Sequence, residues 1–129
     1  MIIYYCLAIA MILPIILAFS SIPFRVKQLS SVNVVEPRAQ AEMLTDAGAR
    51  IVAAQKNAWE ALLLFAVSLF IAFVNNVPAN DIAVAAMIFI AARILHPIFY
   101  VLGLGILRMM SFATAFAAVL WIIHRALFV

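Results

Sequence analysis

The chain has 129 residues and a net charge of +3; 70% of its residues are hydrophobic and only 10% are charged. Soluble domains have about 45–50% apolar and about 25% charged residues, so this composition excludes a water-soluble protein and indicates one membrane-embedded domain over residues 1–129. No basic patch interleaved with aromatic residues is present, which excludes nucleic acid as a partner and leaves the lipid bilayer.

Four apolar segments each approach the roughly 20 residues that a helix needs to cross a bilayer. They predict an all-α integral membrane four-helix bundle with spans at about residues 2–24, 48–75, 79–104 and 107–129. We expect a kink at Pro14 in the first span. We expect this span to be retained, because no basic segment precedes it and no small-residue cleavage site stands out after it; the alternative is a cleaved signal peptide. The single cysteine, Cys6, predicts neither an intrachain disulfide nor a metal cluster.

The loops predict how the bundle is oriented. The second loop, NNVPAND, is a turn without basic residues, whereas Arg108 follows the third loop and several basic residues surround the first. By the positive-inside rule, loops one and three face the cytoplasm and both termini lie outside, as we expect for a bacterial inner membrane. The basic residues of the first loop and its flanks are Arg25, Lys27, Arg38, Arg50 and Lys56.

The second span begins with a polar cluster. Arg50, Gln55, Asn57 and Glu60 precede the apolar run LLLFAVSLFIAFV. A charged side chain at the centre of a membrane helix costs about 2.5–3.5 kcal/mol on translocon scales, so such residues usually face a partner or a wet cavity. Asn57 and Glu60 are neighbours at i,i+3 on the helix. We therefore expect this cluster to point at protein or ligand rather than at lipid.

The third span carries a second polar stripe. Arg93, His96 and Tyr100 fall on one helix face at i, i+3 and i+7, beside Pro97, which removes a backbone donor. We expect Asn57 and Glu60 to approach this stripe and form a binding site with it.

The predicted topology places the polar ends of all four spans on the cytoplasmic side. A ring of cations from the four spans, tempered by Glu60, would suit a small polyanionic ligand. The alternative for Arg108 is that its side chain only reaches the lipid headgroups. The ring would comprise Arg25, Lys56, Arg93 and Arg108.

At this point the segments resemble a known family. RIVAAQKNAWEALLLF resembles the second-helix signature of the MAPEG family, the membrane-associated proteins in eicosanoid and glutathione metabolism. ARILHPIFYVLG resembles its third-helix element, with His96 and Tyr100 at the paired positions. RVK at residues 25–27 resembles the basic end of the first helix, and Arg108 the arginine that opens the fourth. The matching positions of the second helix are Arg50, Ala54, Gln55, Asn57, Glu60 and Phe65.

The resemblance implies a homotrimer that binds glutathione between neighbouring subunits and acts as a transferase or peroxidase on hydrophobic electrophiles. Arg108 is then the candidate catalytic residue that stabilises the thiolate, with help from Arg25, while Asn57 and Glu60 hold the polar backbone groups of the peptide. The expected glutathione-binding residues are Arg25, Arg50, Gln55, Asn57, Glu60, Arg93, His96 and Tyr100.

Two other functions stay open. Ala53 stands where eukaryotic members of the family often have a second arginine, which is compatible with a non-catalytic protein that binds a lipid or metabolite. Four short spans also suit a small multidrug exporter. Such a pump needs a membrane-embedded acid, and the only candidate is Glu60 in the second span, close to Lys56.

Overall fold

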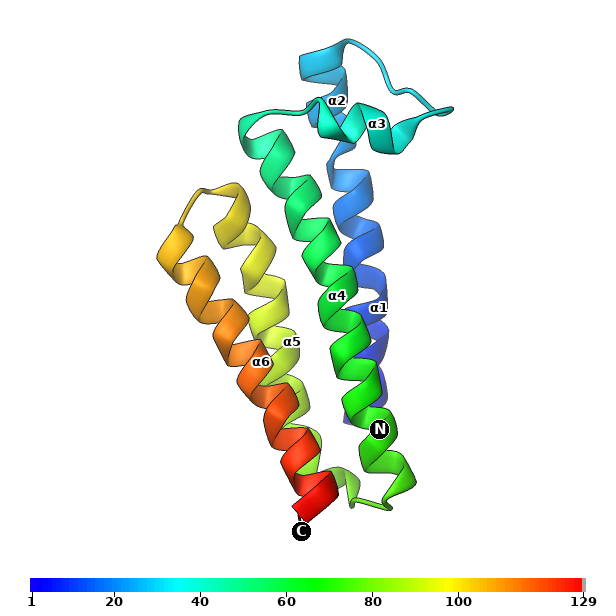
Figure 1. The fold of residues 1–129 in the computed structure, drawn as a ribbon, viewed down its shortest axis with the longest axis vertical. Coiled ribbons are helices and arrows are strands. Elements are labelled where there is room, and N and C mark those ends of the chain that lie inside the picture. The colour runs from blue at the N-terminus through cyan, green and yellow to red at the C-terminus, as the bar shows by residue number, and fades with distance from the viewer. Residues whose placement is uncertain (129) are drawn as a thin grey trace.

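The computed structural model describes residues 1–128, which form an all-helical bundle (Figure 1). Four segments are long and apolar enough to cross a membrane, and the first of them, Ile2–Leu29, comprises two consecutive helices. The predicted all-α integral membrane bundle is confirmed. The helices are α1 (Ile2–Ser20), α2 (Ile22–Leu29), α3 (Pro37–Glu42), α4 (Asp46–Val74), α5 (Ala79–Val101) and α6 (Gly105–Phe128).

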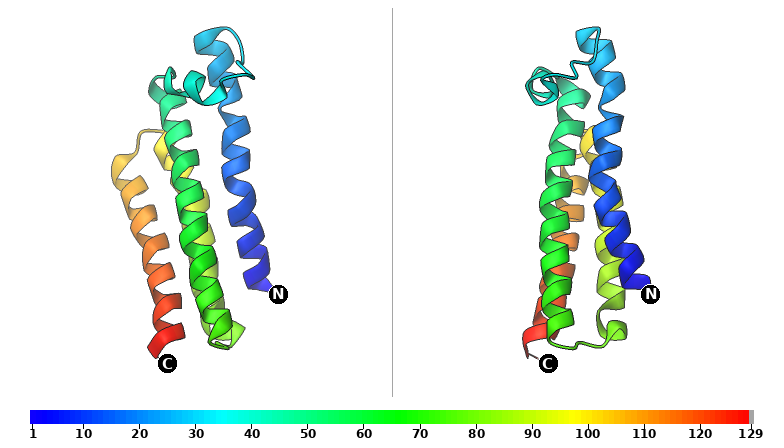
Figure 2. Two further views of the ribbon diagram at one scale, coloured as in Figure 1. Left: turned by 45° about the vertical axis from the view of Figure 1, so that its right-hand side comes forward. Right: turned by 90° about the vertical axis from the view of Figure 1, so that its right-hand side faces the viewer.

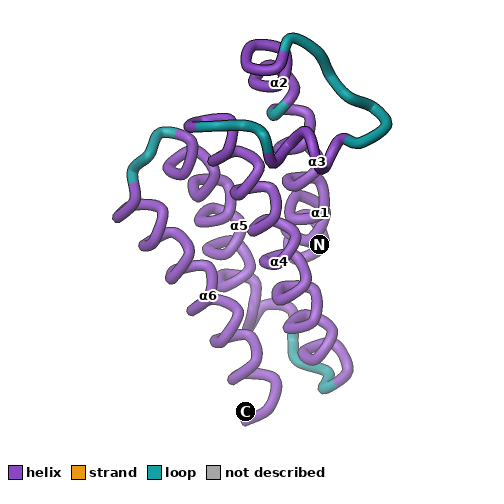
Figure 3. The backbone as a smooth tube through the Cα atoms, turned by 45° about the horizontal axis from the view of Figure 1, so that its top comes forward, coloured by secondary structure: helices purple, strands orange, loops and turns teal. Residues whose placement is uncertain are grey.

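The long helices pack as two neighbouring pairs. Helix α1 lies beside α4, and α5 packs against α6 more extensively than any other pair (Figures 1 and 2). The α2–α3–α4 connection and the α5–α6 turn lie at one end of the bundle, whereas both termini and the α4–α5 turn lie at the other (Figures 1 and 3). The first group of connections marks what we call the loop end.

The first span differs from its predicted limits. Helix α1 runs through Pro14 as one helix, and the first span is interrupted at Ser21. There the Ser21 hydroxyl donates to the carbonyl of Ala18 over 2.7 Å, and Pro23 occupies the first turn of α2, where its missing N–H costs nothing. Helix α2 then carries the chain to Leu29, beyond the predicted end at residue 24.

The turn between α5 and α6 is a tight Schellman cap. Leu104 N–H donates to the carbonyl of Phe99 over 2.9 Å, and Gly103 N–H donates to that of Tyr100 over 3.0 Å. Gly103 has φ +74°, a left-handed conformation that glycine adopts without steric strain. Two carbonyls of α5 are thereby satisfied, and α6 begins almost at once, which brings its first turns beside the last turns of α5.

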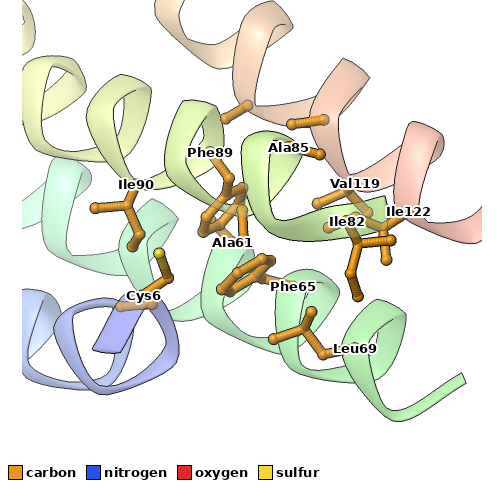
Figure 4. Packing of buried hydrophobic residues seen from close by; sticks show 14 of the residues in the cluster. Cys6, Ala61, Phe65, Leu69, Ile82, Ala85, Phe89, Ile90, Val119 and Ile122 are labelled. Carbon is orange, nitrogen blue, oxygen red and sulfur yellow. The ribbon is translucent and has the colours of Figure 1, made fainter. Parts of the chain in front are cut away.

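The larger of two apolar clusters fills the half of the bundle away from the loop end. A smaller cluster lies nearer the loop end and comprises Leu17, Ala41, Leu44, Ile51, Val52, Ala54 and Ala58. Phe65 of α4 and Phe89 of α5 stack with ring centroids 4.1 Å apart and an interplanar angle of 13° (Figure 4). Buried alanines, among them Ala61 and Ala85, allow the helices to approach closely. This packing fixes α4, α5 and α6 relative to one another, and so positions the polar side chains of the loop-end half.

Candidate functional site

Polar side chains of α4 and α5 meet near the loop end. Arg93 donates from Nη2 to Oδ1 of Asn57 over 2.9 Å, and Asn57 donates from Nδ2 to Oε2 of Glu60 over 3.2 Å. The predicted approach of the two polar stripes is confirmed for Asn57 and Arg93. Asn57 thus links a guanidinium on α5 to a carboxylate on its own helix. Glu60 itself is exposed in the single chain.

Arg93 and His96 are deeply buried, and each has side-chain nitrogens without a hydrogen-bond partner among the described residues. Each side chain is only 2% exposed. Among residues 1–128, Nε and Nη1 of Arg93 and Nδ1 of His96 have no hydrogen-bond partner. Pro97 has no N–H, so the backbone carbonyl of Arg93 also lacks its usual helical donor. Because unpaired polar groups are costly in an apolar interior, this part of α5 is suited to receiving a polar ligand.

A cavity of about 290 Å³, here called the polar cavity, opens beside this cluster. The Arg108 guanidinium carbon lies 4.7 Å from the ring centroid of Tyr100, and the rings of Tyr100 and His96 meet edge to face with centroids 5.7 Å apart. Ser111 donates its hydroxyl to the Arg108 carbonyl over 2.8 Å, so it serves the helix. The lining residues are Ala53, Asn57, His96, Tyr100, Arg108, Met109 and Phe112.

The chemistry of the polar cavity suits an anion. Arg108 is half-buried, and among the described lining residues it is the one with a permanent positive charge. Asn57, His96 and Tyr100 can supply further hydrogen bonds. A carboxylate or a thiolate would find both a cation and directional donors there.

A smaller cavity of about 120 Å³, here called the apolar cavity, lies next to the polar one between α4, α5 and α6. The two cavities share Asn57 and Phe112 in their linings. Glu60 and Arg93 are the charged residues of the apolar cavity. Its other lining residues are apolar: Ala61, Leu64, Phe89, Ala115, Phe116 and Val119.

Other predicted site residues lie on the opposite face of α4. Arg25, Gln55 and Lys56 line a third cavity, of about 460 Å³, which we call the α3 cavity because α3 covers it. Arg25 donates from Nη1 to the carbonyl of Pro37 over 2.7 Å and to Oε1 of Gln40 over 3.2 Å. The predicted ring of four cations is therefore not formed within one chain, because α4 separates Arg25 and Lys56 from the other two.

Arg50 lies apart from all three cavities. Its Nε donates to the carbonyl of Val101 over 3.1 Å. Since the last carbonyls of a helix have no partner within the helix, Arg50 satisfies the C-terminal end of α5 from the neighbouring α4. In the single chain its contact is thus with the backbone of the protein.

Two polar features escaped the sequence analysis. Gln40 of α3 is buried, and besides the Arg25 contact it accepts from Asn33 N–H over 2.9 Å and donates to the Ser31 carbonyl over 2.8 Å. A glutamine in a polar loop gives no signal of such a role. At the end remote from the loops, Arg125 and Asp81 form an ion pair of 2.6 Å. Asp81 and Arg125 are equally far from Gly103 along the chain. A prediction that α5 and α6 are antiparallel helices joined at Gly103 would therefore have placed these two residues at the same level.

The chain was also compared with known proteins. The sequence model that describes the MAPEG family matches residues 2–128, which is nearly the whole chain. No curated protein and no solved structure gave a match. The family match covers all three cavities and every site residue described above.

Proposed function

The chain belongs to the MAPEG family, and from that premise we propose that it is a membrane-embedded glutathione-dependent transferase or peroxidase acting on hydrophobic electrophiles. The observation that carries this proposal is the polar cavity. In its lining the Arg108 guanidinium of α6 stacks on the Tyr100 ring of α5, and Asn57 of α4 lines the same cavity. Residues of this type fit a peptide that bears carboxylates and a thiol. Unpaired donors on Arg93 and a free ring nitrogen on His96 support the same proposal.

In this proposal glutathione supplies the sulfur nucleophile. A free thiol has a pKa of about 8.5, which nearby cations lower, and Arg108 is the residue placed to stabilise a thiolate in the polar cavity. Asn57 and Glu60 hold the polar backbone groups of the peptide, and Tyr100 keeps the Arg108 guanidinium in place. The protein's own cysteine, Cys6, lies buried in the apolar core on α1.

We further propose that the protein is a homotrimer in the bacterial inner membrane, with the loop end in the cytoplasm. The division of the predicted residues between two faces of α4 supports this assembly. A neighbouring subunit could bring Arg25 and Gln55 of its α3 cavity to the polar cavity, and would cover Glu60, which is exposed in the single chain. Arg50 would then act indirectly, by holding the end of α5 that carries Tyr100.

The experiment is a glutathione titration on detergent-purified protein, followed by conjugation with 1-chloro-2,4-dinitrobenzene. We expect saturable binding of glutathione and formation of the conjugate. Lys27→Ala serves as the control, because Lys27 is an exposed cation on α2 that lines none of the three cavities. Absence of both glutathione binding and turnover in the wild-type protein would refute the proposal.

A second candidate is a non-catalytic protein that binds a lipid or an anionic metabolite in the same cavity. Ala53 favours it, because this residue lines the polar cavity where a second arginine would add charge. Saturable binding without turnover, with every Arg108 variant equally inactive, would select this candidate. The match to the MAPEG family leaves the multidrug-exporter interpretation without support.

A further inference from the structure

The loop between α2 and α3, residues 30–36 and here called the valine loop, presents two apolar side chains outside the bundle. Val34 is 83% exposed and Val35 is 85% exposed, more than any other large apolar side chain among residues 1–128. Exposed apolar residues in the middle of the spans face lipid tails, but these two lie in a loop. In water such a pair is unfavourable, because apolar surface is costly to hydrate.

Hydrogen bonds hold the valine loop in an ordered turn. Oδ1 of Asn33 accepts from the backbone N–H groups of Val35 and Glu36, each over 2.9 Å. Asn33 itself donates from its backbone N–H to Oε1 of the buried Gln40 over 2.9 Å, which ties the loop to α3. The two valines are therefore displayed by a defined local structure.

The contacts of Arg25 place the valine loop at the surface of the membrane. Helix α1 has 19 residues without a charged side chain, and at 1.5 Å per residue it rises about 28 Å, close to the hydrocarbon thickness of about 30 Å. Arg25 follows in α2 and thus lies in the headgroup layer. It donates to the carbonyl of Pro37 over 2.7 Å, and Val35 is two residues from Pro37.

The valine loop also points along the membrane plane. It extends sideways from the bundle, beyond α1 and at the level of α3 (Figure 1). Two exposed cations, Lys27 and Arg38, flank it and suit lipid phosphates, whereas the exposed Glu36 within it is an acid. Because the acid offsets part of the positive charge, the contact of the loop with a membrane surface should be mainly apolar.

We propose that the valine loop is an interfacial anchor, in which Val34 and Val35 insert into the headgroup layer of the bilayer that surrounds the protein. Segments of this kind bury apolar side chains about 5–10 Å into the boundary between headgroups and acyl chains. Since Gln40 accepts from both Asn33 and Arg25, the anchor sets the depth of this cation as well. The inference does not rest on the proposed function, because residues 30–36 line none of the three cavities.

The test measures how often a nitroxide label at position 35 collides with oxygen, which partitions into lipid, and with a water-soluble nickel chelate. The full chain carries Val35→Cys in a Cys6→Ser background, which removes the single native cysteine, and is reconstituted in phosphatidylcholine nanodiscs. Ser31→Cys is the matched control, because it lies in the same loop next to the end of α2. We expect the ratio of oxygen to nickel collisions to be severalfold higher at position 35 than at position 31.

Two other results at position 35 would overturn the inference. A label that collides mainly with the nickel chelate would place the valine loop in water. A label shielded from both reagents would place it against protein, such as a second copy of this chain. Each labelled variant is first compared with the wild-type protein by elution volume and melting temperature.

Two controls separate the loop from the label and from charge. Val34→Asp beside the label at position 35 should move that label toward water, because a carboxylate resists leaving it. An unchanged ratio would mean that the nitroxide inserts by itself, and the anchor would be rejected. Adding phosphatidylglycerol to the nanodiscs should change the ratio little. Insertion only with this anionic lipid would assign the contact to the cations and refute an apolar anchor.

Discussion

Asn57 and Arg93, which are 36 residues apart in the chain, share a hydrogen bond of 2.9 Å that joins the polar half of α4 to that of α5. Asn57 also lines both the polar and the apolar cavity. Its carboxamide therefore has two functions: its oxygen accepts from the buried guanidinium, and its side chain forms part of the wall between two binding volumes. A change at this position should affect stability and binding together.

The first prediction concerns Asn57→Ala. This variant removes the only hydrogen-bond partner of the Arg93 guanidinium among residues 1–128, and a buried donor left unsatisfied costs about 1–3 kcal/mol, more when it is charged. We expect a lower melting temperature and a higher glutathione dissociation constant. Asn57→Asp, which restores an acceptor, should recover the melting temperature but not the glutathione affinity. Thermal unfolding and titration calorimetry in the same detergent check both; an unchanged melting temperature for Asn57→Ala would contradict the prediction.

The second prediction concerns Arg108→Ala, which should lower turnover far more than glutathione affinity. The interaction strengthens as charge develops on sulfur, and the loss of one such electrostatic contact typically costs about 10²–10³ in rate. Arg108→Lys should rescue turnover only in part, because a point charge cannot stack on Tyr100 as the planar guanidinium does. Steady-state kinetics with varied glutathione measure the effect. Intact turnover in Arg108→Ala with none in Arg25→Ala would move the role to α2.

The third prediction compares two glycines of the α5–α6 turn. A Cβ at Gly103 would contact nothing within 4 Å, but its φ of +74° makes alanine there costly by about 1–2 kcal/mol. Gly105 has the same open surroundings without a positive φ, so Gly105→Ala should be neutral or stabilising by about 0.4–1 kcal/mol. Gly103→Ala should therefore lower the melting temperature, whereas Gly105→Ala should leave it unchanged or raise it. Equal shifts would mean that backbone strain does not govern this turn.

The fourth prediction concerns the ion pair between Arg125 and Asp81. The two side chains are 27% and 35% exposed, and partly exposed pairs contribute only about 0–1 kcal/mol. Arg125→Gln should therefore lower the melting temperature slightly, and less so at high salt, because salt screens the pair. Glutathione affinity should not change, since the pair lies at the end remote from the polar cavity. A double-mutant cycle with Asp81→Asn measures the coupling directly.

The sequence predicted the four spans, because bilayer thickness and hydropathy leave few alternatives. It also predicted the approach of Asn57 to Arg93, because polar stripes on membrane helices are costly to expose to lipid. The turn signals were equally informative: Gly103 marks the α5–α6 turn, and Asn76, with φ +56°, adopts the left-handed conformation after α4. Pro14 lies inside the continuous helix α1, as a proline can in a membrane helix when its surroundings satisfy the freed groups.

The predicted ring of cations is not formed within one chain, for a reason that helical geometry explains. Gln55 and Asn57 are two residues apart, so at 3.6 residues per turn their side chains point about 200° away from each other. They consequently line different cavities, the α3 cavity and the polar cavity. A shared position along the helix axis does not place side chains on the same face of the helix. The sequence of one chain does not indicate which helix faces would meet across an interface with a neighbouring copy.

The fixed position of Arg25 affects the energetics of any anion that it meets. A mobile arginine loses about 1.5–2 kcal/mol of rotamer entropy when it is ordered. Arg25 is already ordered, because the Pro37 carbonyl and the Gln40 carboxamide hold one end of its guanidinium and the Ser21 hydroxyl accepts from its Nε over 3.2 Å. This entropy is lost when α3 folds rather than when a ligand arrives. The short helix, although it touches neither the polar nor the apolar cavity, thereby holds this cation in a fixed position before any anion binds.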